Sequence, residues 1–241
     1  MKRLPLSIIL VEGVSDLAFV GLFLARFCDH PYTAEGLWEL RFKSPLHGKQ
    51  SAWYKGADGR YALVCAVGGG GDCFGSFYDQ YLKPHVQDGK YDCSLVVITD
   101  ADKDEDEAKT HIALSGLTLK RNQWVEGTIR TDFGNEIAYK TFFRVVPEVG
   151  EGSLETVLLN ASQAKEKGIT ESVHSFVDGL DPDCRRHLKK ESSIRKAKLG
   201  IVVNLIDPQK TFSSLEEIFD SIDLTDESVQ ETFGFLRGLV C

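Results

Sequence analysis

The stretch that decides the fold is IILVEGVSD at residues 8–16, and a second stretch, LVVITDAD at residues 95–102, has the same form. Each is a short apolar run, rich in β-branched residues, that ends abruptly in carboxylates. Such a run is typical of a buried strand in a parallel sheet that is covered on both faces. Ligands of these sheets bind just beyond the carboxyl ends of the strands. The two stretches therefore predict an α/β fold with acidic side chains gathered along one edge of a sheet.

Four carboxylates are expected at that edge, namely Glu12, Asp16, Asp100 and Asp102. Two like charges about 4 Å apart repel by roughly 4 kcal/mol at an effective dielectric near 20. A hard divalent cation that takes oxygen ligands, such as Mg²⁺, offsets this repulsion in the simplest way. The pattern thus predicts a divalent metal site. For Asp16 a second interpretation stays open, because an acid in a first helical turn is also favoured by the helix dipole.

Periodicity and turn residues place the remaining elements along the chain. In order, we expect a helix at 16–28 capped by Ser15, an insertion at about 30–60 with one strand at 38–42, a strand at 61–67, a helix at 73–82 ended by Pro84, a strand at 95–99, a helix reaching no further than Arg121, a hairpin of strands 124–130 and 137–146, and helices at 153–164, 171–177, 182–190 and 193–206 followed by two short pieces.

A glycine-rich turn, GGGGD at residues 68–72, follows the expected strand at 61–67. Backbone N–H groups in such a turn can bind phosphate. The turn lacks the Lys-Ser/Thr of a P-loop and does not fit G-x-G-x-x-G. We favour the other interpretation, a tight turn that lets one backbone segment approach another.

Composition narrows the class of protein. The chain has 241 residues, 42% of them hydrophobic, and a net charge of −8, so it carries no general basic surface for nucleic acid. Its six cysteines form no C-x-x-C pair, which favours a reducing cytoplasm and argues against structural zinc. Glu12 and Asp16 interrupt the N-terminal apolar run, which argues against a signal peptide. The next apolar run, at 17–27, is too short to span a bilayer. We expect a cytoplasmic protein with no membrane partner.

One segment reverses the charge of this acidic chain. Between residues 184 and 198 basic residues face a single acid, Glu191; they are Arg185, Arg186, Lys189, Lys190, Arg195, Lys196 and Lys198. A functional interpretation is contact with a phosphate backbone beside the acidic edge. The alternative is a solvated helix face, which describes most charge runs. We lean to the first, because a carboxylate site needs help to attract a polyanion.

The two motifs together, VEGVSD at 11–16 and DAD at 100–102, resemble the TOPRIM domain, the metal-binding α/β module of topoisomerases, primases and OLD-type nucleases. The likeness covers about residues 6–105 and is nearest to OLD-type and related stand-alone TOPRIM proteins. It implies a Rossmann-like, mostly parallel sheet flanked by helices, and phosphoryl transfer that depends on one or two Mg²⁺ or Mn²⁺ ions. Glu12 would bind metal and act in acid–base chemistry, Asp100 and Asp102 would bind metal, and Asp16 would serve a second ion.

The resemblance extends to later positions. Glu155 matches a later acidic position of relatives, although helix electrostatics explain it equally well. A late lysine near the metals would be Lys196 or Lys198, where it would stabilise charge on the scissile phosphate. The implied organisation is a TOPRIM-like core over residues 1–150 and a helical C-terminal region over residues 151–241.

The leading hypothesis is a nuclease that cleaves DNA or RNA. Members of the OLD family carry an ATPase domain, and this sequence has no P-loop, so an ATPase partner protein would have to supply that activity. The alternative is a non-catalytic subunit that binds metal or nucleic acid in a larger assembly. A phosphoacceptor of the receiver type also gathers acids at strand ends, but the Glu-Gly turn and the late helices fit it poorly.

Overall fold

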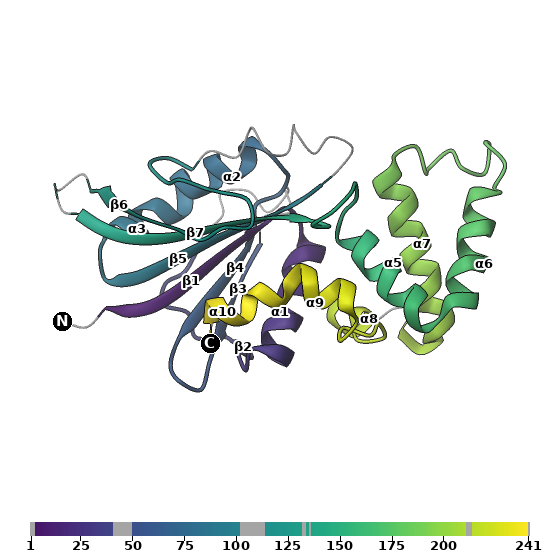
Figure 1. The fold of residues 1–241 in the computed structure, drawn as a ribbon, viewed down its shortest axis with the longest axis horizontal. Helices are drawn as coiled ribbons and strands as arrows, with labels where there is room; N and C mark the ends of the chain where they lie inside the picture. The colour runs from purple at the N-terminus through teal and green to yellow at the C-terminus, as the bar shows by residue number, and fades with distance from the viewer. Residues whose placement is uncertain are drawn as a thin grey trace.

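The computed structural model describes residues 3–40, 50–101, 114–131, 134, 136–210 and 214–240. Over these residues the chain forms a seven-stranded sheet in the order β2-β3-β4-β1-β5-β7-β6 (Figure 1). Its strands are β1 (Leu4–Val11), β2 (Tyr32–Thr33), β3 (Gln50–Lys55), β4 (Tyr61–Ala66), β5 (Tyr91–Asp100), β6 (Val125–Arg130) and β7 (Glu136–Val146). The four central strands are parallel, and the outer strands β2, β3 and β6 are antiparallel to their neighbours. The predicted α/β fold with a largely parallel sheet is confirmed, and so is the hairpin of β6 and β7.

Helices cover both faces of this sheet. They are α1 (Val14–Phe27), α2 (Asp72–Phe77), the π-helical η2 (Tyr78–Leu82), α3 (Lys83–Gln87), α5 (Leu154–Lys165), α6 (Lys167–Asp178), α7 (Glu191–Ile206), the 3₁₀-helical η3 (Pro208–Lys210), α8 (Leu215–Phe219), α9 (Glu227–Phe233), the 3₁₀-helical η4 (Gly234–Leu236) and α10 (Arg237–Val240). Figure 1 shows α2 and α3 on one face of the sheet and α1 with α9 on the other. Nowhere in the described ranges does a helix have the length and apolarity that crossing a membrane takes.

The central strands are buried on both sides. Along β1, Ile9 and Val11 pack into the hydrophobic cluster shared with α1, whereas Ile8 and Leu10 pack into the one shared with α2. All four side chains are fully buried. Each contributes about 1.5–3 kcal/mol by leaving water. This is why the strand reads as a continuous apolar run, and it gives the residues at its end a rigid base.

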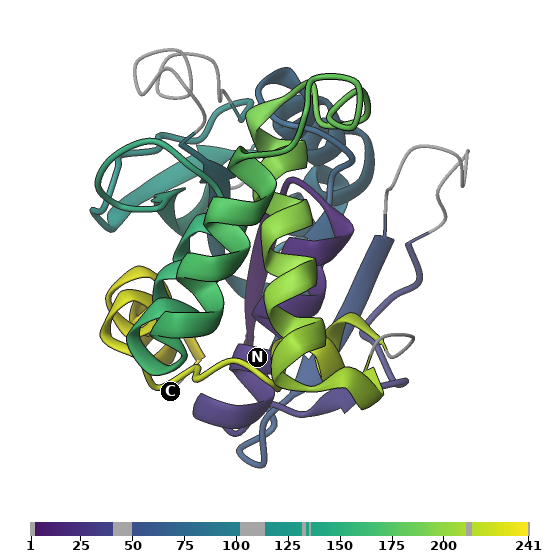
Figure 2. The same cartoon turned by 90° about the vertical axis from the view of Figure 1, so that its right-hand side faces the viewer.

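The helical C-terminal region divides into two parts. Helices α5, α6 and α7 lie beyond the carboxyl ends of the parallel strands, and Figure 2 looks directly onto them. The chain then returns along the sheet beside α1, where Phe233 packs against Phe19 with ring centroids 4.7 Å apart. At the far end the hydroxyl of Ser7 donates to the carbonyl of Leu239 at 3.2 Å. The first part therefore lies beyond the edge at which the acids are expected, whereas the second covers one face of the sheet.

Two predicted helix boundaries are wrong. Gly13, not Ser15, precedes α1, because its extended backbone lets its N–H reach the carboxylate of Asp16. Pro84 does not end the helical run; it occupies the second position of α3, where a missing N–H matters least. The run continues to Gln87.

The connecting segments differ more from expectation. Residues 38–40 form no strand, and the rest of that predicted strand lies outside the described residues; β2 and β3 are the strands of the insertion. Trp38 instead stacks on His85, with ring centroids 4.4 Å apart. The predicted helix at 182–190 is a series of turns. Most of the predicted helix after Asp100 lies outside the described residues, and residues 114–123 form turns and isolated bridges.

Candidate active site

Glu12 and Asp100 lie at the same edge of the sheet. β1 and β5 are parallel neighbours, with Leu10 paired to Val97, so both strands end at that edge. The backbone N–H of Asp100 donates to Oε1 of Glu12 at 3.0 Å, and the hydroxyl of Thr99 donates to the same oxygen. A backbone hydrogen bond thus joins two acidic residues that are 88 positions apart in the sequence.

The glycine-rich turn after β4 lies against Glu12. The N–H groups of Gly68 and Gly69 donate to the backbone carbonyl of Glu12 at 3.0 and 3.1 Å. A Cβ at Gly70 would lie 3.1 and 3.2 Å from the two carboxylate oxygens of Glu12. The turn therefore has the favoured role, close approach of one backbone segment to another. The N–H groups of Gly68 and Gly69, which a phosphate-binding turn would offer to its ligand, are therefore already bonded within the protein.

Asp16 serves its helix and belongs to the acidic group. Its Oδ2 accepts the N–H of Gly13 at 2.9 Å, which caps α1. Burial raises the pKa of Asp16 from the ordinary 3.8 to about 7; the Gly13 hydrogen bond opposes this, while the charges of Glu155 and Glu12 raise the pKa further. The interpretation of Asp16 as a residue that stabilises its helix N-terminus is therefore supported, and its role as a metal ligand stays a prediction.

Helix α5 brings Glu155 to the group. The side chain of Glu155 is only 8% exposed, and its Oε2 accepts the hydroxyl of Ser153 at 2.7 Å. The first N–H of α5, from Leu154, donates to Oδ1 of Asp100 at 3.4 Å. The N-terminus of this helix therefore faces the end of β5, where its dipole favours negative charge.

The two candidate lysines on α7 point to different neighbours. Nζ of Lys196 lies 3.8 Å from Oε1 of Glu155, and its positive charge lowers the pKa of Asp16. Nζ of Lys198 instead bonds to Asp178 of α6 at 2.8 Å and is largely buried there. The structure brings Lys196, and not Lys198, to the acidic group.

The other basic residues lie on the turns before α7 and in its first half. Arg186, Lys189 and Lys190 are exposed, whereas Arg185 and Arg195 are partly buried. They precede Lys196 along the chain, so they extend the positive charge away from the acids toward the turns at 182–187. Asp102, the remaining predicted ligand, lies outside the described residues.

The acidic group suits a hard divalent cation in its donor chemistry. Glu12, Asp16 and Asp100 line one small cavity together with Thr99 and apolar residues of α1, and all three offer carboxylate oxygens. Among the described residues, no three Asp, Glu, His or Cys side chains lie close enough together to form a metal-binding group as they stand.

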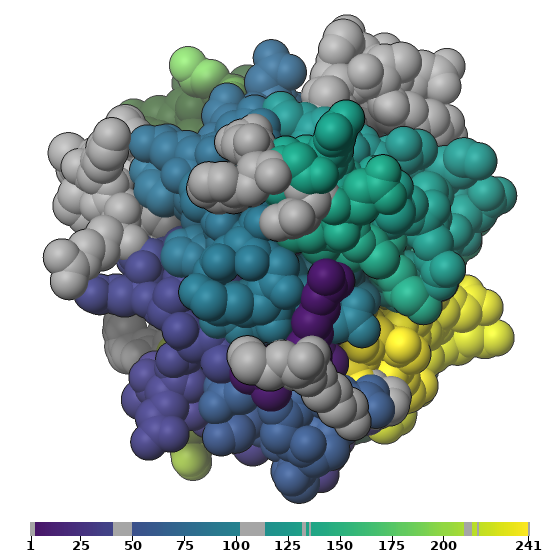
Figure 3. Space-filling view, turned by 90° about the vertical axis from the view of Figure 1, so that its left-hand side faces the viewer, coloured from purple at the N-terminus to yellow at the C-terminus, as the bar shows by residue number. Residues whose placement is uncertain are grey.

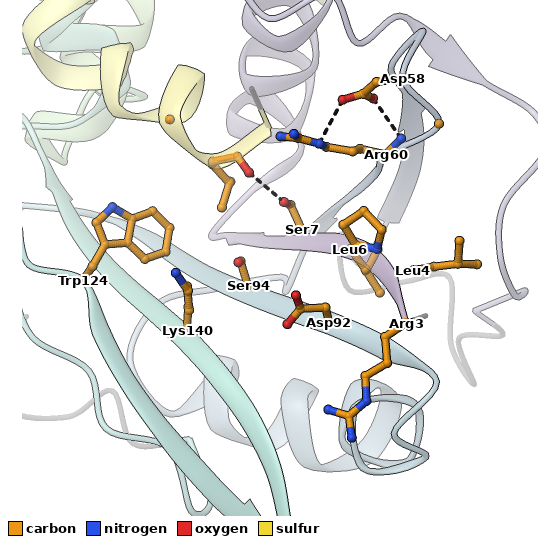
Figure 4. Close-up of a pocket in the computed structure, with 14 residues that line it drawn as sticks. Arg3, Leu4, Leu6, Ser7, Asp58, Arg60, Asp92, Ser94, Trp124 and Lys140 are labelled. Atoms are coloured by element: carbon orange, nitrogen blue, oxygen red, sulfur yellow. Dashed lines mark hydrogen bonds and ion pairs between the residues drawn. The ribbon is translucent and has the colours of Figure 1, made fainter. Parts of the chain in front are cut away.

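A larger groove lies at the opposite, amino edge of the sheet, where the N-terminal strand and the C-terminal helices lie side by side (Figure 3). It encloses about 850 Å³ and is lined by β1, the start of β5, Trp124 and Lys140 (Figure 4). Two of its basic residues are paired with acids, since Arg60 bonds to Asp58 at 2.9 Å and Lys140 to Glu126 at 2.7 Å. Charges of both signs line the groove, so like charge is not gathered there.

Two contributors to the acidic edge escape sequence reasoning, Thr99 and Ser153. Each is a small hydroxyl residue that is almost fully buried, at 4% and 1% exposure. The only available signal was position: Thr99 directly precedes Asp100, and Ser153 precedes the helix that carries Glu155.

Comparison with known proteins gives little. No protein family matches the chain, and neither does any curated protein. Among solved structures, a hypothetical protein from Pyrococcus horikoshii OT3 is similar, with a TM-score of 0.45 and 13% identity over 99% of this chain and 100% of that one. Similarity at this level assigns neither family nor activity.

Proposed function

We propose that this protein is a divalent-metal-dependent nuclease of the TOPRIM type that hydrolyses phosphodiester bonds of DNA or RNA. The observation that carries the proposal is the contact between Glu12 and Asp100 at the ends of adjacent parallel strands, with Asp16 and Glu155 beside it. A carboxyl group whose pKa is raised by burial and by neighbouring like charges, as that of Asp16 is, is typical of working sites. Carboxylates gathered in this way are poor fold stabilisers, so a functional role accounts for them better than a structural one.

Each of these residues has a proposed role, and for the described ones it agrees with their contacts. Glu12, Asp16 and Asp100 would hold Mg²⁺ or Mn²⁺, with Asp102 and Glu155 as further ligands; when bound, the ion supplies an activated water and screens the phosphate charge. Glu12 would also act in acid–base chemistry; Asp16, whose pKa burial raises to about 7, would lose that proton on binding the cation. Lys196 projects toward the acids and would stabilise negative charge on the scissile phosphate.

The exposed basic residues Arg186, Lys189 and Lys190 would bind the flanking backbone, with Arg185 and Arg195 beside them. A net charge of −8 repels a polyanion, so local positive charge next to the acids is needed to admit one. Contacts of this kind carry no base specificity, which fits binding of either DNA or RNA.

The test is cleavage of supercoiled plasmid and of single-stranded RNA with Mg²⁺ or Mn²⁺, using the wild-type chain, Glu12→Gln and Asp100→Asn. Because each variant removes a ligand that contributes several kcal/mol, we expect losses of at least about a hundredfold with folding retained. Asp92→Asn is the matched control, since Asp92 is an exposed acid at the other end of β5 and should leave the rate unchanged.

Equal cleavage by the wild type and both variants would identify a contaminating nuclease and reject the proposal. Calorimetric Mn²⁺ binding by the wild type without any cleavage would instead support the non-catalytic subunit, and an ATPase partner would then be sought.

A further inference from the structure

The carboxylate of Glu12 is fixed from one side by Thr99. The threonine is 4% exposed, and its hydroxyl donates to Oε1 of Glu12. The same oxygen accepts the N–H of Asp100, so two donors from consecutive residues of β5 fix the direction of one carboxylate. Hydrogen bonds to a charged group are stronger than those between neutral groups, and two of them are enough to select one rotamer of a glutamate.

Gly70 limits the same carboxylate from the opposite side. A Cβ built at Gly70 would lie 3.1 Å from Oε1, 3.2 Å from Oε2 and 3.3 Å from Cδ of Glu12. The backbone of Gly70 is not in the left-handed region, unlike that of Gly71 at φ 54°. Alanine can therefore adopt its conformation, and the cost of a methyl group there falls on the Glu12 carboxylate.

We propose that Thr99 and Gly70 are positioning residues for the metal site, which together hold Glu12 in the orientation that binds the ion. The inference rests on the proposed function, because it names what keeps a ligand of that site in place. Thr99 supplies the hydrogen bond that orients the carboxylate, and Gly70 supplies the space that the carboxylate occupies. Both residues would act through Glu12 and not as ligands themselves.

The first test pairs Thr99→Val with Thr99→Ser. Valine keeps the shape and loses the hydroxyl, whereas serine keeps the hydroxyl and loses a methyl group. Removing a hydrogen-bond partner of a metal ligand lowers affinity about 10–100-fold. We therefore expect Thr99→Val to weaken Mn²⁺ binding by at least about tenfold in calorimetry and to lower kcat, with KM for plasmid nearly unchanged. Thr99→Ser should restore most of the affinity.

The second test uses Gly70→Ala, with Gly200→Ala as control. The new methyl group of Gly70→Ala presses on Glu12, whereas the one at Gly200, in α7, meets no atom within 4 Å. We expect Gly70→Ala to bind Mn²⁺ more weakly than the wild type and Gly200→Ala to bind it equally well. Crystal structures should show the Glu12 carboxylate displaced in Gly70→Ala and Thr99→Val but not in Thr99→Ser. This variant also keeps the inference testable should Thr99→Val fail to fold.

Equal Mn²⁺ affinity for the wild type, Thr99→Val and Gly70→Ala would overturn the positioning role and leave the nuclease proposal standing. A wild-type chain that binds no Mn²⁺ would overturn both.

Discussion

The two edges of one parallel sheet offer opposite kinds of site. The carboxyl edge holds Glu12, Asp16 and Asp100 around a small cavity, within reach of the buried Glu155. The amino edge holds an open groove of about 850 Å³. By size alone the groove is the better candidate for a ligand site. By chemistry it is the weaker one.

The difference lies in how each edge handles its charges. At the amino edge, acids and bases are mixed, and two ion pairs lie in solvent, where each contributes about 0–1 kcal/mol. At the carboxyl edge, like charges lie together and the pKa of Asp16 rises to about 7. A fold retains such a group of like charges at the expense of stability, so a cluster of like charge indicates function better than cavity volume does.

The largest expected effect is on stability as pH changes. Folding raises the pKa of Asp16 from 3.8 to about 7, so the folded state binds more protons than the unfolded state between those values. The stability contributed by protonated Asp16 is fully present below about pH 4 and is lost as pH rises through 7, up to about 4 kcal/mol. We expect Asp16→Asn, which stays neutral and still accepts the Gly13 N–H, to exceed the wild type in unfolding free energy at pH 8 and to match it at pH 4.

Urea unfolding in EDTA at pH 4, 6 and 8 measures this difference, with Asp92→Asn as the amino-edge control. Parallel pH profiles for the wild type and Asp16→Asn would show that the carboxyl edge carries no electrostatic strain, and the contrast between the edges would disappear.

The next effect separates Lys196 from Lys198. Lys196→Gln should lower cleavage by about 10²-fold, comparable to the loss of one preorganised group that stabilises developing charge, with little change in stability. Lys198→Gln should leave cleavage nearly intact and lower the unfolding free energy by about 1 kcal/mol, because its mostly buried ammonium bonds to Asp178. Initial cleavage rates and urea unfolding of both variants distinguish these outcomes. If Lys198→Gln lost cleavage and Lys196→Gln did not, the catalytic lysine would be Lys198.

These lysines show where sequence reasoning reaches its limit. Lys196 and Lys198 are two residues apart, so their side chains point roughly 200° apart around the helix axis. Only one of them can therefore face α5, and the sequence does not say which. The strands were predictable because burial on both faces imposes an unbroken apolar run, as in β1. The acids at the strand ends followed from that, since parallel neighbours end at the same edge.

Other features depend on contacts that no local pattern encodes. The turns at 182–187 are rich in charge and lack an apolar stripe, so composition favoured a helix that no packing stabilises. The return of α8–α10 along the sheet is set by contacts such as Phe19 with Phe233, which unite distant parts of the chain. In the sequence Thr99 looks like any other β-branched strand residue, because only the fold brings its hydroxyl against Glu12.

The smallest effect is expected at the amino edge. Trp124, 41% exposed, packs on Phe142 with ring centroids 5.0 Å apart, so Trp124→Ala should lower the unfolding free energy by about 1 kcal/mol and change cleavage by less than about twofold. Along β5, Ser94 in this groove lies six residues before Asp100, roughly 20 Å away, so only a substrate that spans both edges would contact both. Rates for a dinucleotide RNA and for plasmid therefore sharpen the comparison. A loss of more than tenfold on plasmid with normal cleavage of the short RNA would make the groove part of the nucleic-acid path, because only the long substrate reaches it. If Trp124→Ala cleaved both substrates at the wild-type rate, both binding and cleavage would be confined to the carboxyl edge.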